Sequence, residues 1–133
     1  MILEALIAIL IFSFGILAIV ALQAVSVKLA GDAKYRADAS LVAEELLSQM
    51  WTSDRVPANM SANYGSVAAG AGYTAWVANS VSTTLPGTVA NPPIVVVDTS
   101  ANTATTGTTT ITVRWQAPNE ATPHSHTVTA QIR

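Results

Sequence analysis

The feature that most constrains this chain is a run from Ala5 to Val27 without a charged residue. A helix needs about 20 predominantly apolar residues to cross a bilayer, and this run is longer. A cleaved signal peptide has a shorter apolar core of roughly 7–15 residues that follows positive charge. Here the only charge before the run is the carboxylate of Glu4. The run therefore predicts a membrane-spanning helix over residues 1–27 and disfavours an ordinary signal peptide.

Glu4 also distinguishes this helix from an ordinary membrane anchor. A carboxylate at the mouth of an apolar helix is costly unless something compensates its charge. One source of compensation is local, because unpaired backbone N–H groups and the positive end of the helix dipole favour an anion in the first turn. The other is a cation, and the nearest candidate is a free α-amino group of this chain or of a neighbour. Both remain open at this point, and the second would make the segment an assembling helix.

Beyond Val27 the pattern changes from uniformly apolar to amphipathic, and there is no proline before Pro57. Charged residues occupy some faces, whereas apolar residues recur at close to helical spacing. The apolar set comprises Leu29, Ala33, Ala37, Leu41, Leu47, Met50 and Trp51. We therefore expect one helix of about 50 residues that ends between Thr52 and Arg55.

The rest of the chain carries strand signals after a Gly-rich stretch, residues 58–72, that is typical of a loop. Alternating or β-branched segments predict strands at Tyr73–Val77, Ile94–Val97, Thr109–Gln116 and Thr127–Arg133. The last two strands are expected to pair antiparallel across a polar loop. A small sheet with one apolar face needs a cover, and the amphipathic half-helix is the only large candidate.

The expected fold class is α+β: a long N-terminal helix lies on a small antiparallel sheet. The hydrophobic half of the helix, residues 1–27, is expected to protrude. A head over residues 28–133 would contain the amphipathic half-helix 28–55 and a sheet within 73–133. The expected core between helix and sheet consists of Leu41, Leu47, Trp51, Ile111, Val113, Trp115, Val128 and Ile132.

Composition excludes several classes of function. The chain has no cysteine, which excludes disulfides, Cys-ligated zinc and thiol catalysis. A net charge of −2, thinly spread, argues against nucleic-acid binding, which needs clustered Lys and Arg. His124 and His126 could hold a metal with Glu120, but solvated loop histidines are the favoured interpretation. No nucleophile elbow or phosphate-binding glycine loop occurs. We therefore expect a protein that is not an enzyme and that binds no cofactor or metal.

The opening of the chain resembles the type IV pilin family. Mature pilins begin with a hydrophobic residue, continue into an apolar helix and carry a glutamate at the fifth position. Residues 1–4 match this pattern if a leader and one further residue precede Met1. The segment LEALIAILIFSFGILAIVALQA, residues 3–24, looks most like the PilV group of minor pilins. The likeness continues in the spacing of Leu41, Ala43, Leu46 and Met50.

The resemblance implies a minor pilin of a type IV pilus. Such proteins cross the inner membrane once, with the head in the periplasm, and are cut and N-methylated by a prepilin peptidase. An assembly platform then draws them into the pilus at the cell surface. Minor pilins of this kind are thought to prime assembly at the tip, with other minor and major pilins and in some cases a tip adhesin, in support of adhesion or twitching motility.

The resemblance also assigns roles to residues of the apolar helix. It implies that Glu4 pairs with the N-terminal amine of an adjacent subunit. It implies that helices pack in the filament core through Leu6, Ile9, Leu10, Phe12, Phe14, Gly15 and Leu17.

Two alternatives remain. A minor pseudopilin of a type II secretion system shares the same helix and glutamate, so the sequence separates it poorly from a minor pilin. A signal-anchored periplasmic binding or enzymatic domain has no requirement for Glu4. A further comparison concerns major pilins. Many of them carry a proline about twenty residues from the mature N-terminus, where this chain has alanine and leucine. The difference favours a minor subunit over the main one.

Overall fold

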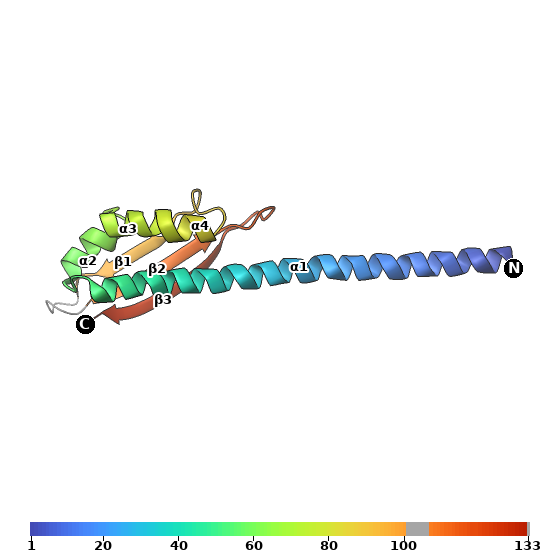
Figure 1. The fold of residues 1–133 in the computed structure, drawn as a ribbon, viewed down its shortest axis with the longest axis horizontal. Helices are drawn as coiled ribbons and strands as arrows, with labels where there is room; N and C mark the ends of the chain where they lie inside the picture. Colours follow the sequence, from blue (N-terminus) through green and yellow to red (C-terminus); the bar gives the residue numbers. More distant parts are fainter. Residues whose placement is uncertain (101–106, 133) are drawn as a thin grey trace. The chain divides into compact units, whose positions relative to one another are not determined.

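The computed structural model describes residues 1–100 and 107–132. A long helix, α1 (Ile2–Thr52), precedes a set of short helices and then the strands (Figure 1). The later elements are α2 (Pro57–Tyr64), α3 (Ala71–Trp76), the π-helical turn η1 (Val77–Val81), α4 (Ser82–Thr84), β1 (Ile94–Asp98), β2 (Gly107–Trp115) and β3 (His124–Ile132). The chain divides into two compact units, Met1–Lys34 and Tyr35–Arg133. We call them the N-terminal unit and the head, and describe each by itself. From here on the head means Tyr35–Arg133, not the residues 28–133 expected from the sequence.

The head contains a sheet with the order β1-β2-β3, in which both neighbouring pairs are antiparallel. β2 and β3 pair without a break, from Gly107 opposite Ile132 to Trp115 opposite His124. The predicted hairpin of the last two strands is therefore confirmed. The strand predicted at Ile94–Val97 is confirmed as β1.

Side chains alternate between the two faces of the sheet, as the period of a strand requires. Along β2, every second residue is buried, from Gly107 through Ile111 to Trp115, and the residues between them are partly exposed. The partly exposed face carries a block of threonines. Their hydroxyl groups lie 3.4 Å apart for Thr110 and Thr129 and 3.1 Å apart for Thr112 and Thr127. One face is thus core and the other is a polar, hydroxyl-rich surface.

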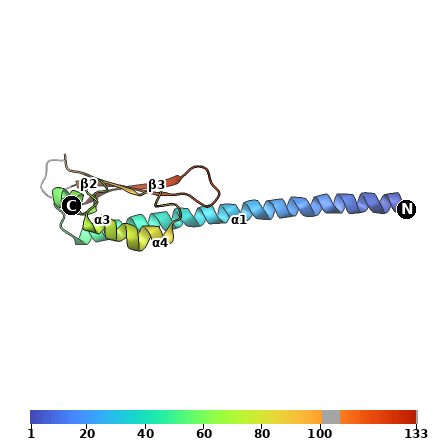
Figure 2. The ribbon, with the colours of Figure 1, turned by 90° about the horizontal axis from the view of Figure 1, so that it is seen from above.

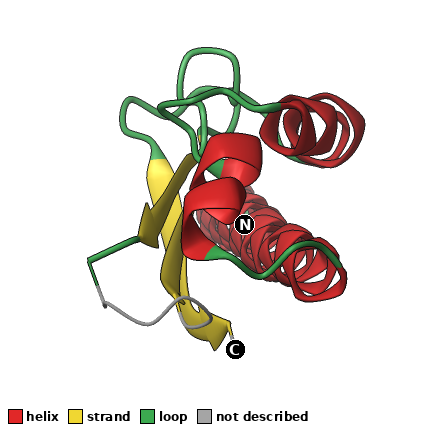
Figure 3. Ribbon diagram, turned by 90° about the vertical axis from the view of Figure 1, so that its left-hand side faces the viewer, coloured by secondary structure: helices red, strands yellow, loops and turns green. Residues whose placement is uncertain are grey.

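The buried face of the sheet is covered by two helical segments that lie in one layer (Figures 2 and 3). The first is the part of α1 that belongs to the head, and the second runs from α3 to α4. The indole N–H of Trp76 donates to the carbonyl of Val42 at 3.0 Å, and the Ser80 hydroxyl donates to the Glu45 carboxylate at 2.9 Å. These bonds fix the second segment against α1. The expected α+β arrangement, a helix on a small antiparallel sheet, is therefore present.

The strand predicted at Tyr73–Val77 is wrong, because this segment forms α3 and the start of η1. Tyr73 and Trp76 are both buried and lie three residues apart, which is the spacing of one helical face. The Tyr73 hydroxyl donates to the carbonyl of Pro93 at 2.8 Å. The aromatic residues that suggested a strand therefore anchor a covering helix.

The loop predicted over residues 58–72 is also partly wrong, because α2 occupies Pro57–Tyr64. Proline stands in its first turn, where its fixed φ suits a helix and its missing N–H costs nothing. Pro57, Met60 and Tyr64 are buried at a spacing of three and four residues. The small polar residues between them concealed this pattern.

The core expected between helix and sheet is correct for the sheet and partly wrong for the helix. Ile111, Val113, Trp115 and Ile132 are buried. Leu47 and Val128 are only partly buried, at the margin of the core. Leu41 and Trp51 are not core residues, since they are 65% and 52% exposed. The buried residues of α1 are instead Ala39, Val42, Ala43, Leu46 and Met50.

The contrast between the tryptophans gives a test of the covering layer. Trp76 is 1% exposed and bonds to α1, whereas Trp51 is half-exposed. Trp76→Phe should lower the free energy of unfolding by about 1–3 kcal/mol, because a buried hydrogen bond and apolar area are lost. Trp51→Phe is the matched control and should change it by less than about 0.5 kcal/mol. Denaturant unfolding followed by circular dichroism measures both, and equal losses would contradict the arrangement.

The buried phenol of Tyr73 makes the stability of the head depend on pH. Burial raises the pKa of Tyr73, and the nearby Arg114 opposes this more weakly. Because the folded-state pKa lies above the unfolded value, the stability contributed by the neutral phenol is complete below about pH 10 and is lost as the pH rises further. Tyr73→Phe should be about 1 kcal/mol less stable than the native chain at pH 7, through loss of the bond to Pro93.

That difference should shrink above pH 10, where the native tyrosine is forced to ionise and phenylalanine is not. Unfolding curves of the two proteins at both pH values provide the comparison. A difference that grows with pH would contradict the assignment.

Candidate membrane and assembly segment

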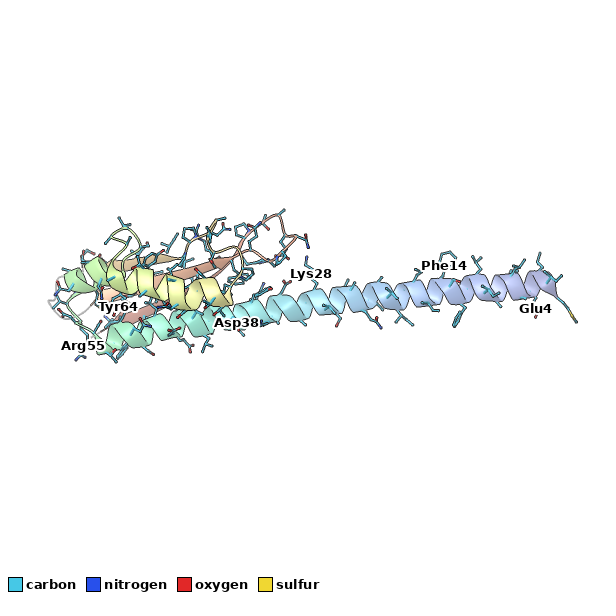
Figure 4. All side chains as sticks on the ribbon, turned by 45° about the horizontal axis from the view of Figure 1, so that its top comes forward. Glu4, Phe14, Lys28, Asp38, Arg55 and Tyr64 are labelled. Carbon is cyan, nitrogen blue, oxygen red and sulfur yellow. The ribbon has the colours of Figure 1, made fainter. Side chains whose placement is uncertain are left out.

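The N-terminal unit is a single stretch of α1 in which the first turn carries the only charge before Lys28 (Figure 4). α1 begins at Ile2, and the N–H of Ala5 donates to the carbonyl of Met1 at 3.1 Å. Alanine and leucine, which favour helices, are frequent in the run that follows. α1 places Glu4 in its first turn.

The apolar side chains of this unit are exposed around the whole circumference of the helix. Phe12, Phe14 and Leu17 are 68%, 64% and 63% exposed, and Phe14 is labelled in Figure 4. Exposed apolar surfaces of this extent are typical of membrane-contacting or protein-binding segments, because their exposure to water is unfavourable. α1 is long and apolar enough to cross a membrane, by length and composition. At 1.5 Å per residue the uncharged run covers about 35 Å, slightly more than a hydrocarbon core of about 30 Å.

One polar side chain inside the run, Ser13, bonds within the helix. The hydroxyl of Ser13 donates to the carbonyl of Ile9, one turn earlier, at 2.7 Å. Serine often returns its hydroxyl to the backbone in this way in helices. In an apolar medium an unsatisfied hydroxyl would be costly, so this bond makes Ser13 compatible with lipid or with a dry filament core.

The residues expected to pack between helices lie on several sides of α1. Near the N-terminus, a shallow apolar depression is lined by Leu3, Leu6, Ile7 and Leu10. Two of these, Leu3 and Ile7, were not among the packing residues expected from the sequence. A Cβ atom added at Gly15 would meet no atom within 4 Å. Contacts within this chain therefore do not require glycine at that position. The structure describes no second helix against these positions, and their role in packing stays a prediction.

Glu4 is exposed, and among residues 1–100 and 107–132 no side chain or backbone donor bonds to its carboxylate. It stands where the helix dipole favours an anion, so the local compensation is present in the single chain. A dipole is worth only about 0.3–1 kcal/mol at an exposed terminus. Moving an ion out of water costs several kcal/mol, which is far more than the dipole contributes. The helix dipole alone therefore does not offset the transfer of the Glu4 carboxylate into an apolar environment.

The two histidines of the head lie in a strand. His124 and His126 lie on β3 and not in the loop that the sequence suggested. The Nε2 atom of His124 lies 2.6 Å from a carboxylate oxygen of Glu120, and its ring stacks on Trp115 with centroids 5.8 Å apart. Across the described parts of the chain, no three residues of metal-binding type come together.

No family model, no curated protein and no solved structure matches this chain.

The length and apolarity of the N-terminal unit predict that a charged side chain introduced there would weaken insertion into a membrane. Leu17→Arg, near the centre of the run, should raise the free energy of membrane insertion by about 2.5–3.5 kcal/mol. Leu41→Arg is the matched control, because Leu41 is equally exposed but lies in the head. Alkaline extraction of membranes from expressing cells should release the first variant and retain the second. Equal retention of both would contradict the assignment of the anchor.

Proposed function

We propose that this chain is a minor pilin of a type IV pilus. In this proposal it waits in the inner membrane, with its head in the periplasm, and then enters the filament through α1. The observation that carries the proposal is the placement of Glu4 in the first turn of a helix whose following side chains are apolar and exposed on all sides. An ordinary anchor needs the apolar side chains but has no use for the carboxylate.

The energetics of Glu4 support assembly over simple anchoring. In a filament the apolar helices pack together, and each carboxylate leaves water. A carboxylate buried without a partner costs several kcal/mol, whereas one paired with the N-terminal amine of the next subunit compensates both charges. The pair also sets the axial position of one helix against the next, because only one stagger brings the two groups together. The exposed depression at Leu3, Leu6, Ile7 and Leu10 lies beside this pair and suits a neighbouring helix.

The head supports the proposal in a second way. It buries its own core with the last part of α1 and does not need the N-terminal unit for that purpose. The N-terminal unit can therefore exchange lipid for neighbouring helices while the head stays folded. A pilin must do this when it leaves the membrane. The proposed partners are accordingly other minor and major pilins, the prepilin peptidase and the assembly platform, with a tip adhesin where the pilus carries one.

The test is to replace Glu4 while keeping the protein in the membrane. Glu4→Gln and Glu4→Ala should leave the amount in the membrane fraction unchanged, because neither weakens the apolar run. Incorporation into filaments should fall by about 100-fold or more, since breaking one side of a buried pair costs about 3–5 kcal/mol. Immunoblots of sheared filaments and of membranes from the native cell measure the two quantities.

Glu44→Gln is the matched control, because Glu44 is an exposed carboxylate on α1 within the head. It should enter filaments normally. Normal incorporation of Glu4→Gln would reject the proposal and favour a periplasmic domain on a simple anchor. Loss of secreted enzymes with normal pili, after deletion of the gene, would instead identify a minor pseudopilin.

A further inference from the structure

The two edges of the sheet in the head differ in how they are covered. At the β1 edge, the backbone N–H and the hydroxyl of Ser66 both donate to the carbonyl of Val95, at 3.0 and 3.2 Å. α2 also lies against this strand. The inward side chains of Val95 and Val97 are 1% and 7% exposed. The chain therefore closes its own sheet at the β1 edge.

At the β3 edge, no described strand continues the sheet. β3 is the last strand in the sheet, and among residues 1–100 and 107–132 only β2 pairs with it. Figure 3 shows the strand that leads to the C-terminus at the margin of the sheet. Its inward positions from His124 to Ala130 are only half-buried, whereas every inward position of β2 is buried. The core is thus incompletely covered on this side, and no strand among the described residues lies beyond β3.

β3 also lacks the features that protect natural edge strands from pairing. Such strands are usually short, carry Lys or Pro, or are interrupted by a bulge. β3 has 9 residues, contains no Lys, Arg, Asp, Glu or Pro, and pairs with β2 without a bulge. Its threonines, valine and isoleucine favour the extended conformation. An edge with these properties is a template for another strand.

We propose that β3 binds an extended segment of another protein chain, which joins the sheet as a fourth strand. The backbone of the incoming segment pairs with the outward N–H and C=O groups of β3. Its alternate side chains lie beside Val128 and Ala130 and complete the half-covered core. The others extend the threonine face beside Thr127 and Thr129. The recognised chemistry is an uncharged strand in which apolar or small residues alternate with short polar ones.

The size of the edge favours an extended segment over a second folded copy of the chain. A stable interface between two folded proteins takes about 20–30 residues from each partner. Edge-to-edge pairing of two heads through β3 would engage only the 9 residues of this strand on each side. An extended segment makes backbone and side-chain contacts along its whole length, and it orders as it binds. A short edge therefore suits a peptide better than it suits a dimer.

The register of the sheet supplies a matched pair of variants. Thr127 and Thr129 on β3 lie in the same two rows as Ile94 and Val96 on β1, joined through Thr112 and Thr110 of β2. Thr127→Lys with Thr129→Lys places two charges on the open edge. Ile94→Lys with Val96→Lys places the same charges on the same face at the closed edge. If either double variant loses its native near-ultraviolet circular dichroism, Thr129→Lys and Val96→Lys alone make the same comparison.

The probe is a synthetic peptide of nine alternating threonines and valines with flanking lysines, added to the full chain in detergent micelles. Fluorescence anisotropy measures affinity, and amide hydrogen exchange by NMR locates the contact. We expect saturable binding that slows exchange at every second amide between residues 124 and 132. Lysines at the β3 edge should weaken affinity by about 10-fold or more, and lysines at the β1 edge by less than about two-fold.

Several results would overturn the proposal. These are protection at β1 in place of β3, equal effects of the two double variants, or unchanged affinity of a peptide whose strand residues are all N-methylated. Protection of β3 that needs no peptide and rises with protein concentration would identify a second copy as the occupant and reject the assigned partner. The Glu4→Gln variant should bind the peptide normally, so the outcome is independent of the test of filament incorporation.

Discussion

The head depends on the burial of one apolar sheet face that three strands cannot hide by themselves. Strands present alternate side chains to one side, so Ile111, Val113 and Trp115 form a continuous apolar surface on β2. α1 contributes to its cover with a buried face that includes Ala39 and Ala43 (Figure 2). The segment from α3 to α4 completes the layer and is fixed to α1 by the bond from Trp76. Each later feature of the head follows from this coverage, including the edge where it is incomplete.

A single helix serves two purposes because its apolar pattern changes along its length. In the head, one face of α1 is apolar and buried by protein, whereas Leu41 and Trp51 lie outside it and are exposed. In the N-terminal unit they occupy every direction and are exposed. The apolar face in the head is buried by other parts of the same chain. The apolar side chains of the N-terminal unit are removed from water only by lipid or by other helices. The proposed function depends on this difference, since a subunit that moves from membrane to filament must change the surroundings of one part and keep the fold of the other.

Sequence reasoning succeeded where a single periodicity dominated. The end of α1 at Thr52, the strand at Ile94 and the β2–β3 hairpin all follow from patterns of local spacing. It failed where two interpretations shared the same residues. Tyr73 and Trp76 are compatible with a strand by composition and with a helix by spacing, and only the contacts with Pro93 and Val42 select the helix. The apolar spacing predicts Leu41 as a core residue, but Leu41 is 65% exposed, and its neighbours Val42 and Ala43 are buried instead.

Local chemistry was therefore enough to establish the apolar run, the carboxylate that precedes it and the strands that alternate. Charge, hydropathy and period are properties of neighbouring residues, and no contact at a distance can alter them. Which face of α1 is buried and which edge of the sheet is covered depend on residues far apart in the chain. Only the folded head reveals those features. A side chain becomes buried when another element packs against it, and which element does so is not a local property of the sequence.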